Sequence, residues 1–142
     1  MKVKFKKVNP DVKHGPEKAH ADDAGFDLWC YSVDEDRTRG IVSYGTGIAV
    51  EIPEGYVGLL VPRSSVYKVQ LQQANGVGVI DSGYRGELVF KYRVVQPHIK
   101  RYGIGERIGQ LVILPIPEVE MEEVDELSPS DRNTSGFGST GK

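Results

Sequence analysis

The amino-acid sequence predicts an all-β fold, and three features of its pattern lead to that expectation. The 17 glycines and eight prolines among the 142 residues are scattered along the chain, which suits a protein with many turns. The apolar residues come in short runs bounded by turn-forming residues, as in strands joined by tight connections. Only residues 66–73 have a spacing compatible with a helix, whose first turn would begin near Ser64 and Ser65.

The first half of the chain predicts three or four strands. Residues 1–8 alternate apolar and lysine side chains, as an edge strand does when its charges oppose aggregation. Residues 9–23 are polar and predict a loop. Strands are expected at 26–32 and within 41–52, where two glycines divide the apolar run. The charged residues 33–40 between them predict an exposed connection.

The second half continues this pattern. An apolar strand is expected at 56–61, an alternating one at 88–95 and another at 106–116. Residues 97–105 predict a loop, and 119–124 a last short strand.

Residues 75–88, which read NGVGVIDSGYRGEL, combine a short strand with a turn. Asp81 and Tyr84 stand three residues apart in that turn, next to glycine backbone that a flat polar ligand could approach closely. An ordinary surface turn explains Asp81 equally well at this point.

Composition argues against several classes of function. Basic and acidic residues number 18 and 20, for a net charge of −2, so no overall field attracts nucleic acid or an anionic membrane. No apolar run reaches membrane-spanning length, and the basic N-terminus lacks the apolar core of a signal peptide. Cys30 is the only cysteine and predicts a buried thiol in a reducing compartment. We therefore expect a soluble, cytoplasmic protein.

The last fifteen residues differ from the rest. Residues 128–142 are too polar to bury a core, which predicts a β-rich domain over 1–127 followed by a flexible arm over 128–142. The arm nevertheless carries Arg132 and Phe137 among glycines and hydroxyl groups. These groups could bind a planar phosphorylated ligand.

Five stretches taken together resemble the trimeric dUTPase family: AGFDL (24–28), PRSS (62–65), NGVGVIDSGY (75–84), ERIGQL (106–111) and RNTSGFGSTG (132–141). The resemblance implies a jelly-roll-like β-barrel and a homotrimer whose active sites lie at subunit interfaces, each covered by an arm. It also implies hydrolysis of dUTP to dUMP and pyrophosphate with Mg²⁺ on the triphosphate. That reaction limits uracil incorporation into DNA and supplies dUMP for dTMP synthesis.

The third stretch would hold the nucleoside and the attacking water. Asp81 matches the family's catalytic aspartate, which orients and deprotonates a water for attack on the α-phosphorus. Tyr84 matches the tyrosine that packs under the deoxyribose and excludes a 2′-hydroxyl. Asn75 and the backbone of Gly78 match the part that reads uracil.

The first, second and fourth stretches would hold the triphosphate. Arg63 can bind phosphate through two N–H groups, and Ser64 and Ser65 add hydroxyls and amides near a helix start. Gln110 corresponds to a glutamine that contacts phosphate or water. Asp27 corresponds to an aspartate that approaches the metal through water.

The arm would close the site. By the resemblance, Phe137 stacks on uracil and Arg132 meets the γ-phosphate. Ser139 and Thr140 bind the terminal phosphates, and Gly138 lets backbone amides point at their oxygens.

The arm departs from the family pattern at two positions. Asn133 and Ser135 stand where glycine is usual. Asparagine tolerates left-handed backbone angles.

Two rival functions stay open. The first is a dCTP deaminase: these enzymes share the fold implied by the resemblance, but they have a catalytic glutamate where this chain has Lys91. The second is a regulatory protein that uses the nucleotide pocket as a switch. Its charged residues 34–39 would then form the surface that contacts a protein partner.

Overall fold

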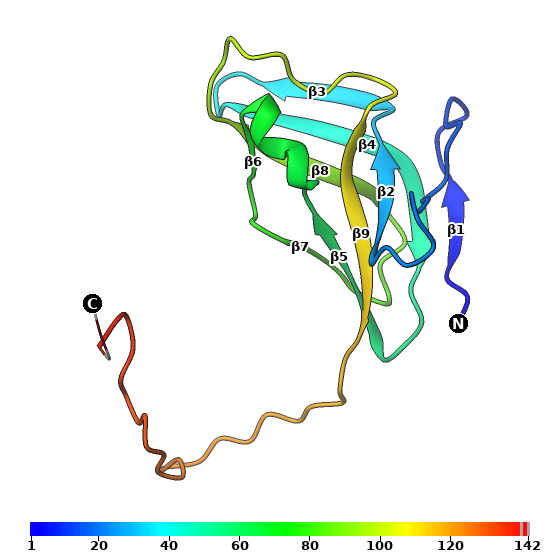
Figure 1. Ribbon diagram of the computed structural model, residues 1–142. Coiled ribbons are helices and arrows are strands. Elements are labelled where there is room, and N and C mark those ends of the chain that lie inside the picture. Colours follow the sequence, from blue (N-terminus) through cyan, green and yellow to red (C-terminus); the bar gives the residue numbers. More distant parts are fainter. Residues whose placement is uncertain (140, 142) are drawn as a thin grey trace.

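The computed structural model describes residues 1–139 and 141, and it places two antiparallel sheets face to face (Figure 1). In the first sheet the strands run in the order β1-β4-β8-β6. Strand β3 lies on the same side of β4 as β1: β1 pairs with residues 48–51 of β4, and β3 pairs with residues 41–45. Its members are β1 (Lys4–Lys7), β3 (Ser32–Asp36), β4 (Ile41–Glu51), β6 (Leu71–Gln73) and β8 (Glu87–Val94).

The second sheet has the order β2-β9-β5-β7. Its members are β2 (Gly25–Trp29), β9 (Arg107–Pro115), β5 (Tyr56–Val61) and β7 (Gly78–Ile80). All its pairings are antiparallel. Two packed sheets are the architecture of a jelly roll, and the all-β prediction is confirmed.

The core fills the space between the sheets. On β8, Leu88, Phe90 and Tyr92 are buried, while the residues that alternate with them face solvent. The hydroxyl of Tyr92 donates a hydrogen bond of 2.6 Å to the carbonyl of Ile108 and so joins β8 to β9 in the opposite sheet. The sheets approach closely here, because a Cβ on Gly109 would collide with the Phe90 ring. Such contacts fix the position of β9, which lines the candidate site.

Cys30 is fully buried in this core, as expected. Burial is the main cause that raises the pKa of its thiol from 9.0 to about 11. A thiol in this setting stays protonated and packs as a small apolar group.

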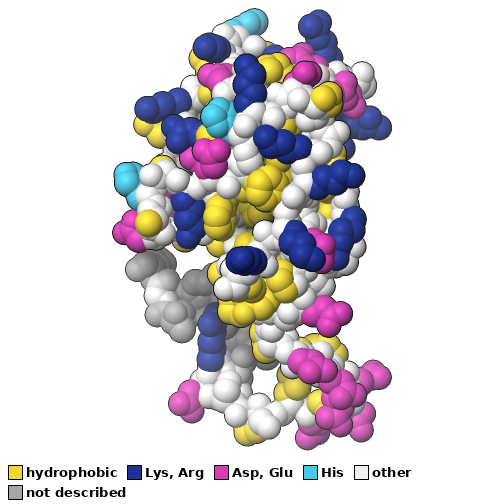
Figure 2. All heavy atoms as spheres, turned by 90° about the vertical axis from the view of Figure 1, so that its right-hand side faces the viewer, with side chains coloured by type: hydrophobic (Ala, Val, Ile, Leu, Met, Phe, Trp, Pro, Cys, Tyr) yellow, Lys and Arg dark blue, Asp and Glu magenta, His cyan; other side chains and the backbone are white. Residues whose placement is uncertain are grey.

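The edge strand predicted at the N-terminus is confirmed. β1 pairs only with β4 among the described strands, and its lysines are exposed. In Figure 2, which faces this side of the molecule, basic side chains surround apolar ones, and acidic side chains gather at the bottom. Residues 118–126, which follow β9, include six acidic ones.

The segment predicted as an exposed connection contains a strand. Residues Ser32–Asp36 pair with β4 from Ile41 to Gly45, although four of the five are exposed. Strand β4 itself is continuous, and the two glycines coincide with a register shift between Gly45 and Ala49 instead of a break.

The helix prediction is partly wrong. The helix η1 spans Ser64–Val69 and is a 3₁₀ helix. The expected C-terminal part of the helix, Leu71–Gln73, is strand β6 paired with β8. Gln70 ends the helix with a left-handed backbone (φ 49°), which turns the chain into that strand.

The chain changes sheets on both sides of β7. Strand β6 belongs to the first sheet, β7 to the second and β8 to the first again. The turn that carries Asp81 therefore links two layers of the sandwich.

After Pro115 the chain extends away from the sheets (Figure 1). The short strand predicted at 119–124 is wrong, since the described part of this segment forms no strand. No helix in the described residues is long and apolar enough to cross a membrane.

Candidate active site

A polar hollow of about 340 Å³ lies at the edge of the second sheet, beside β2, β9 and the start of η1. It brings together four predicted site residues from three separate stretches: Asp27, Arg63, Ser64 and Gln110. Its remaining lining residues are Ala19, His20, Asp23, Ala24, Gly25 and Arg107. A hollow of similar volume, about 370 Å³, lies beside Glu35 and Arg101 and contains none of the predicted nucleotide-site residues.

Asp27 lines this pocket from β2. It pairs with Gln110 across β2 and β9, and only 16% of its side chain is exposed. Arg107 donates a hydrogen bond from Nη1 to Asp27 Oδ2 at 2.9 Å. Arg63 places Nε 3.5 Å from the other carboxylate oxygen, Oδ1. Two guanidinium groups therefore share one largely buried carboxylate.

Arg63 is held through its backbone as well as its side chain. It directly precedes η1 in an extended conformation, and the carbonyl of the preceding Pro62 accepts a hydrogen bond of 3.3 Å from Gln110 Nε2. A Cβ on Gly25 would collide with the Gln110 side chain, so the glycine of AGFDL makes room for this amide.

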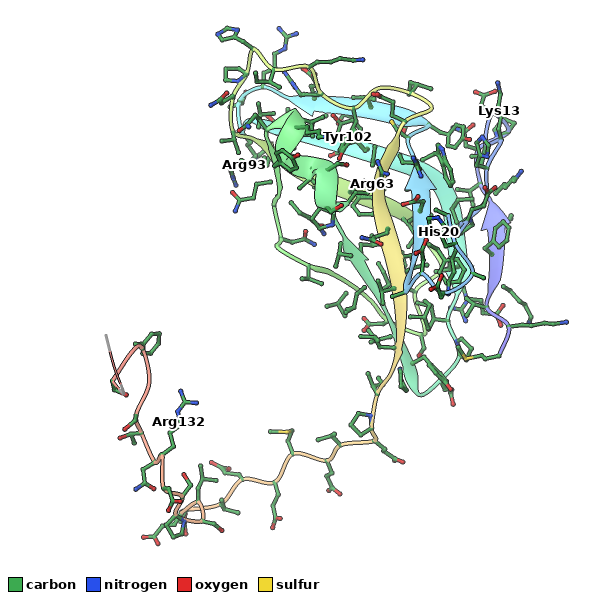
Figure 3. The ribbon with its side chains drawn as sticks, in the orientation of Figure 1. Lys13, His20, Arg63, Arg93, Tyr102 and Arg132 are labelled. Atoms are coloured by element: carbon green, nitrogen blue, oxygen red, sulfur yellow. The ribbon has the colours of Figure 1, made fainter. Side chains whose placement is uncertain are left out.

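A half-buried tyrosine, Tyr102, lies near Arg63 on the side of η1 (Figure 3). Partial burial raises the pKa of Tyr102, and the positive charge of Arg63 opposes that rise. The two side chains are therefore close enough for their charges to interact.

The pocket contains two arginines and two carboxylates. Arg63 and Arg107 balance the charges of Asp27 and Asp23, and Ser64 adds a hydroxyl at the helix start. On the rim, His20 Nδ1 lies 3.5 Å from Asp23 Oδ2. Guanidinium and hydroxyl groups in a concave site are typical of phosphate binding.

The donor set constrains any metal. Among the described residues, no cluster of three or more histidine, cysteine or acidic side chains could hold an ion. Asp27 already accepts from one arginine and lies beside another. The described residues of the pocket therefore offer a metal few ligands of their own, and Mg²⁺ typically takes most of its ligands from water and substrate phosphates.

The predicted nucleoside residues lie elsewhere, around β7. Asp81 is exposed and its carbonyl accepts a hydrogen bond of 3.0 Å from the Tyr84 amide, which closes the turn. Tyr84 is 44% exposed, and its hydroxyl donates to the Glu87 carbonyl at 3.0 Å. Asn75 Nδ2 lies 3.6 Å from the point where a Cβ on Gly78 would stand.

A single chain does not join these residues to the phosphate pocket. β7 and β2 are the two edges of the second sheet, with β9 and β5 between them. Three strand spacings, roughly 14 Å, separate β7 from Asp27 on β2. Arg63 follows β5, which pairs directly with β7, but no β7 residue lines the pocket.

The arm residues are apart from both groups. Phe137 is fully exposed, and Arg132 lies on the arm at a distance from the sheets, where its Nε donates a hydrogen bond of 2.8 Å to the Ser135 carbonyl (Figure 3). Asn133 has a φ of 43°, the left-handed angle expected where glycine is usual. Thr140 lies outside the described residues.

Comparison with known proteins identifies the family. Residues 11–141 match the family model for dUTPase. The chain is also 40% identical to the deoxyuridine 5′-triphosphate nucleotidohydrolase of Clostridium acetobutylicum, over 99% of this chain and 97% of that one. The chain belongs to the dUTPase family. The nucleotidohydrolase of Rhodococcus erythropolis is likewise 40% identical over 99% of this chain and 87% of its own.

Solved dUTPases share the fold. A mutant dUTPase of Staphylococcus bacteriophage 80alpha, solved with dUpNHpp, superposes with a TM-score of 0.84 at 32% identity, over 99% of both chains. A dUTPase of phage phi11 of S. aureus, 30% identical with a TM-score of 0.72 over 89% of this chain and 98% of its own, is described with a structural Mg(II) ion.

Sequence reasoning about this dUTPase-family chain missed Arg107. It stands three residues before Gln110 in ERIGQL, and a strand period of two puts two such residues on opposite faces. The register between β2 and β9 shifts between Leu28 and Trp29, next to the Arg107 pairing. No pattern in the sequence signalled that shift.

Proposed function

We propose that this protein hydrolyses dUTP to dUMP and pyrophosphate. Membership of the dUTPase family supports the reaction, and the polar pocket supports the substrate class. The observation that carries the proposal is the convergence of Asp27, Arg63, Ser64 and Gln110, which come from three separate stretches of the sequence, on one polar hollow.

Asp81 activates the attacking water in this proposal. Its ionised carboxylate accepts a proton from the water while the water oxygen bonds to the α-phosphorus. The bond from that phosphorus to the bridging oxygen of the β-phosphate breaks, and pyrophosphate leaves with the electron pair. Exposure of Asp81 on a turn leaves room for the water and the nucleotide.

The residues around β7 select the nucleoside. Tyr84 packs against the deoxyribose and leaves no space for a 2′-hydroxyl. Asn75 and the Gly78 backbone bind the edge of uracil, and cytosine would leave buried polar groups there unpaired. The tight backbone excludes the methyl group of thymine.

The pocket binds the triphosphate. Arg63 contacts phosphate oxygens with its guanidinium, Ser64 and Ser65 with hydroxyl and amide groups, and Gln110 with phosphate or water. Asp27 would contact a bound Mg²⁺ through water, and the ion would supply positive charge that offsets the charge of the phosphates.

A homotrimer completes the site. The separation of the β7 residues from the phosphate pocket within one chain favours a site built from neighbouring subunits. The arm of residues 128–142 then closes over it, with Phe137 on uracil and Arg132 at the γ-phosphate. Gly138, Ser139 and Thr140 bind the terminal phosphates.

In the cytoplasm this activity would limit uracil incorporation into DNA and supply dUMP for dTMP synthesis. A protein partner that responds to the bound nucleotide would contact residues 34–39, which form the exposed end of β3 and its connection to β4. Retention of such a partner in pull-downs with and without dUpNHpp tests this second role.

A pyrophosphate-release assay with dUTP, dTTP, dCTP and UTP tests the proposed activity. We expect turnover of dUTP and at most a small fraction of that rate with the other three. Ammonia release from dCTP would instead indicate a deaminase, and equal hydrolysis of all four would rule out the proposed specificity.

A further inference from the structure

The carboxylate of Asp27 lies between two guanidinium groups, and each oxygen faces a different one. Oδ2 accepts the 2.9 Å hydrogen bond from Arg107, and Oδ1 lies 3.5 Å from Nε of Arg63. Arg107 is on β9 and Arg63 directly precedes η1, so the shared carboxylate links two elements of the pocket.

Because each oxygen of Asp27 faces a different arginine, only some nitrogens of Arg63 contact the carboxylate. A lone carboxylate pairs with arginine through two parallel N–H···O bonds, which occupy two nitrogens. Here Arg107 holds Oδ2, so only Oδ1 remains for Arg63 and it lies nearest Nε. The two terminal nitrogens of Arg63 are then left for phosphate oxygens.

We propose that Arg107 is a positioning residue, which acts through Asp27 to keep the terminal nitrogens of Arg63 available to the triphosphate. The proposal rests on the proposed function, because it assigns Arg107 a role in binding the same substrate. The Gln110 contact with the Pro62 carbonyl supports it, since β9 then fixes both the backbone before Arg63 and its side-chain partner.

Direct phosphate binding by Arg107 is the alternative. Its side chain is 41% exposed and lines the pocket, so a guanidinium–phosphate contact is sterically open. The two roles differ in their dependence on Asp27. A positioning role needs the Asp27 carboxylate, whereas a direct contact does not.

A double-mutant cycle separates the two roles. The variants are Arg107→Gln, Asp27→Asn and the double substitution, each measured for dUpNHpp affinity by calorimetry at a fixed saturating Mg²⁺ concentration and for KM and kcat with dUTP. Loss of a charge-assisted contact predicts that Arg107→Gln weakens affinity and raises KM about tenfold, with a smaller change in kcat. In the Asp27→Asn background the same substitution is expected to change neither constant by more than about twofold.

An equal loss in both backgrounds would overturn the proposal and assign Arg107 to the phosphates directly. A fall in unfolding temperature without any change in KM would also overturn it, by showing a purely structural role. Arg93→Gln is the matched control, because Arg93 is an exposed arginine on β8 in the other sheet (Figure 3). If the wild-type protein neither bound nor hydrolysed dUTP, the proposed function itself would be wrong. If the enzyme were active but the effects of the two substitutions were additive, only the role proposed for Arg107 would be wrong.

Discussion

At the scale of single residues, Asp81 and Arg63 differ in exposure, and each suits its proposed role. Asp81 is exposed on a turn between the two sheets, where a water molecule can approach it. Arg63 is 27% exposed and is held from two sides. The first arrangement suits proton transfer and the second suits rigid binding of phosphate.

Replacement of Asp81 tests its role as the base. Asp81→Asn is nearly isosteric but cannot take the proton, so we expect the kcat for dUTP to fall by about 10²–10⁴-fold. The affinity for dUpNHpp should change little, because the amide fills the same volume. Stopped-flow turnover and calorimetry give the two numbers, and a variant with wild-type kcat would refute the assignment.

The buried thiol and phenol groups predict how the stability of the fold changes at alkaline pH. Burial raises the pKa of Cys30 from 9.0 to about 11, and it raises those of Tyr44 and Tyr92 as well. Above pH 9 the unfolded chain releases protons that the folded one retains, so the stability falls as the pH rises from about 9 towards 11. The unfolding temperature, measured from pH 7 to 11, should stay nearly constant to about pH 9 and decrease above it. A constant value across that range would contradict the assigned burial.

At the scale of elements, local patterns predicted the strands that bury one face. β8 and β5 have clear apolar periodicity, and both were placed to within a residue or two. β3 was missed because its residues are charged and mostly exposed, and only pairing with β4 makes it a strand. β6 was assigned to a helix because its pairing with β8 is not visible in three residues.

The contact between β8 and β9 gives a stability prediction. Gly109→Ala places a methyl group against the Phe90 ring, which should lower the free energy of unfolding by about 1–3 kcal/mol. Urea denaturation measures the change. Gly103→Ala serves as the control, since a Cβ there meets only Glu106 at an ordinary 3.5 Å. Equal effects of the two substitutions would show that the sheets do not pack closely at this point.

At the scale of the whole molecule, the candidate site is divided into three parts that one chain keeps apart. The resemblance predicted all three sets of residues, and the structure brings four of the triphosphate set, Asp27, Arg63, Ser64 and Gln110, into one pocket. The β7 residues lie at the far edge of the sheet, and Arg132 and Phe137 lie on the extended arm (Figure 1). Contacts between copies leave no period or spacing in a sequence, so their geometry could not be predicted from it.

Removal of the arm tests its proposed role as a lid. Deletion of residues 130–142 should remove most dUTP turnover, because the terminal phosphates and uracil lose their covering groups. The proposed trimer should persist in analytical ultracentrifugation, since the sheets are complete without those residues. Full turnover by the shortened protein would show that the arm takes no part in the reaction.

The position of the cleaved bond shows whether water attacks the α-phosphorus. Hydrolysis of dUTP in water labelled with oxygen-18, followed by mass spectrometry of both products, shows which phosphorus the water attacks. Attack on the α-phosphorus predicts one labelled oxygen in dUMP and none in pyrophosphate. Label in pyrophosphate with unlabelled dUMP would mean attack on the β-phosphorus and would contradict the account.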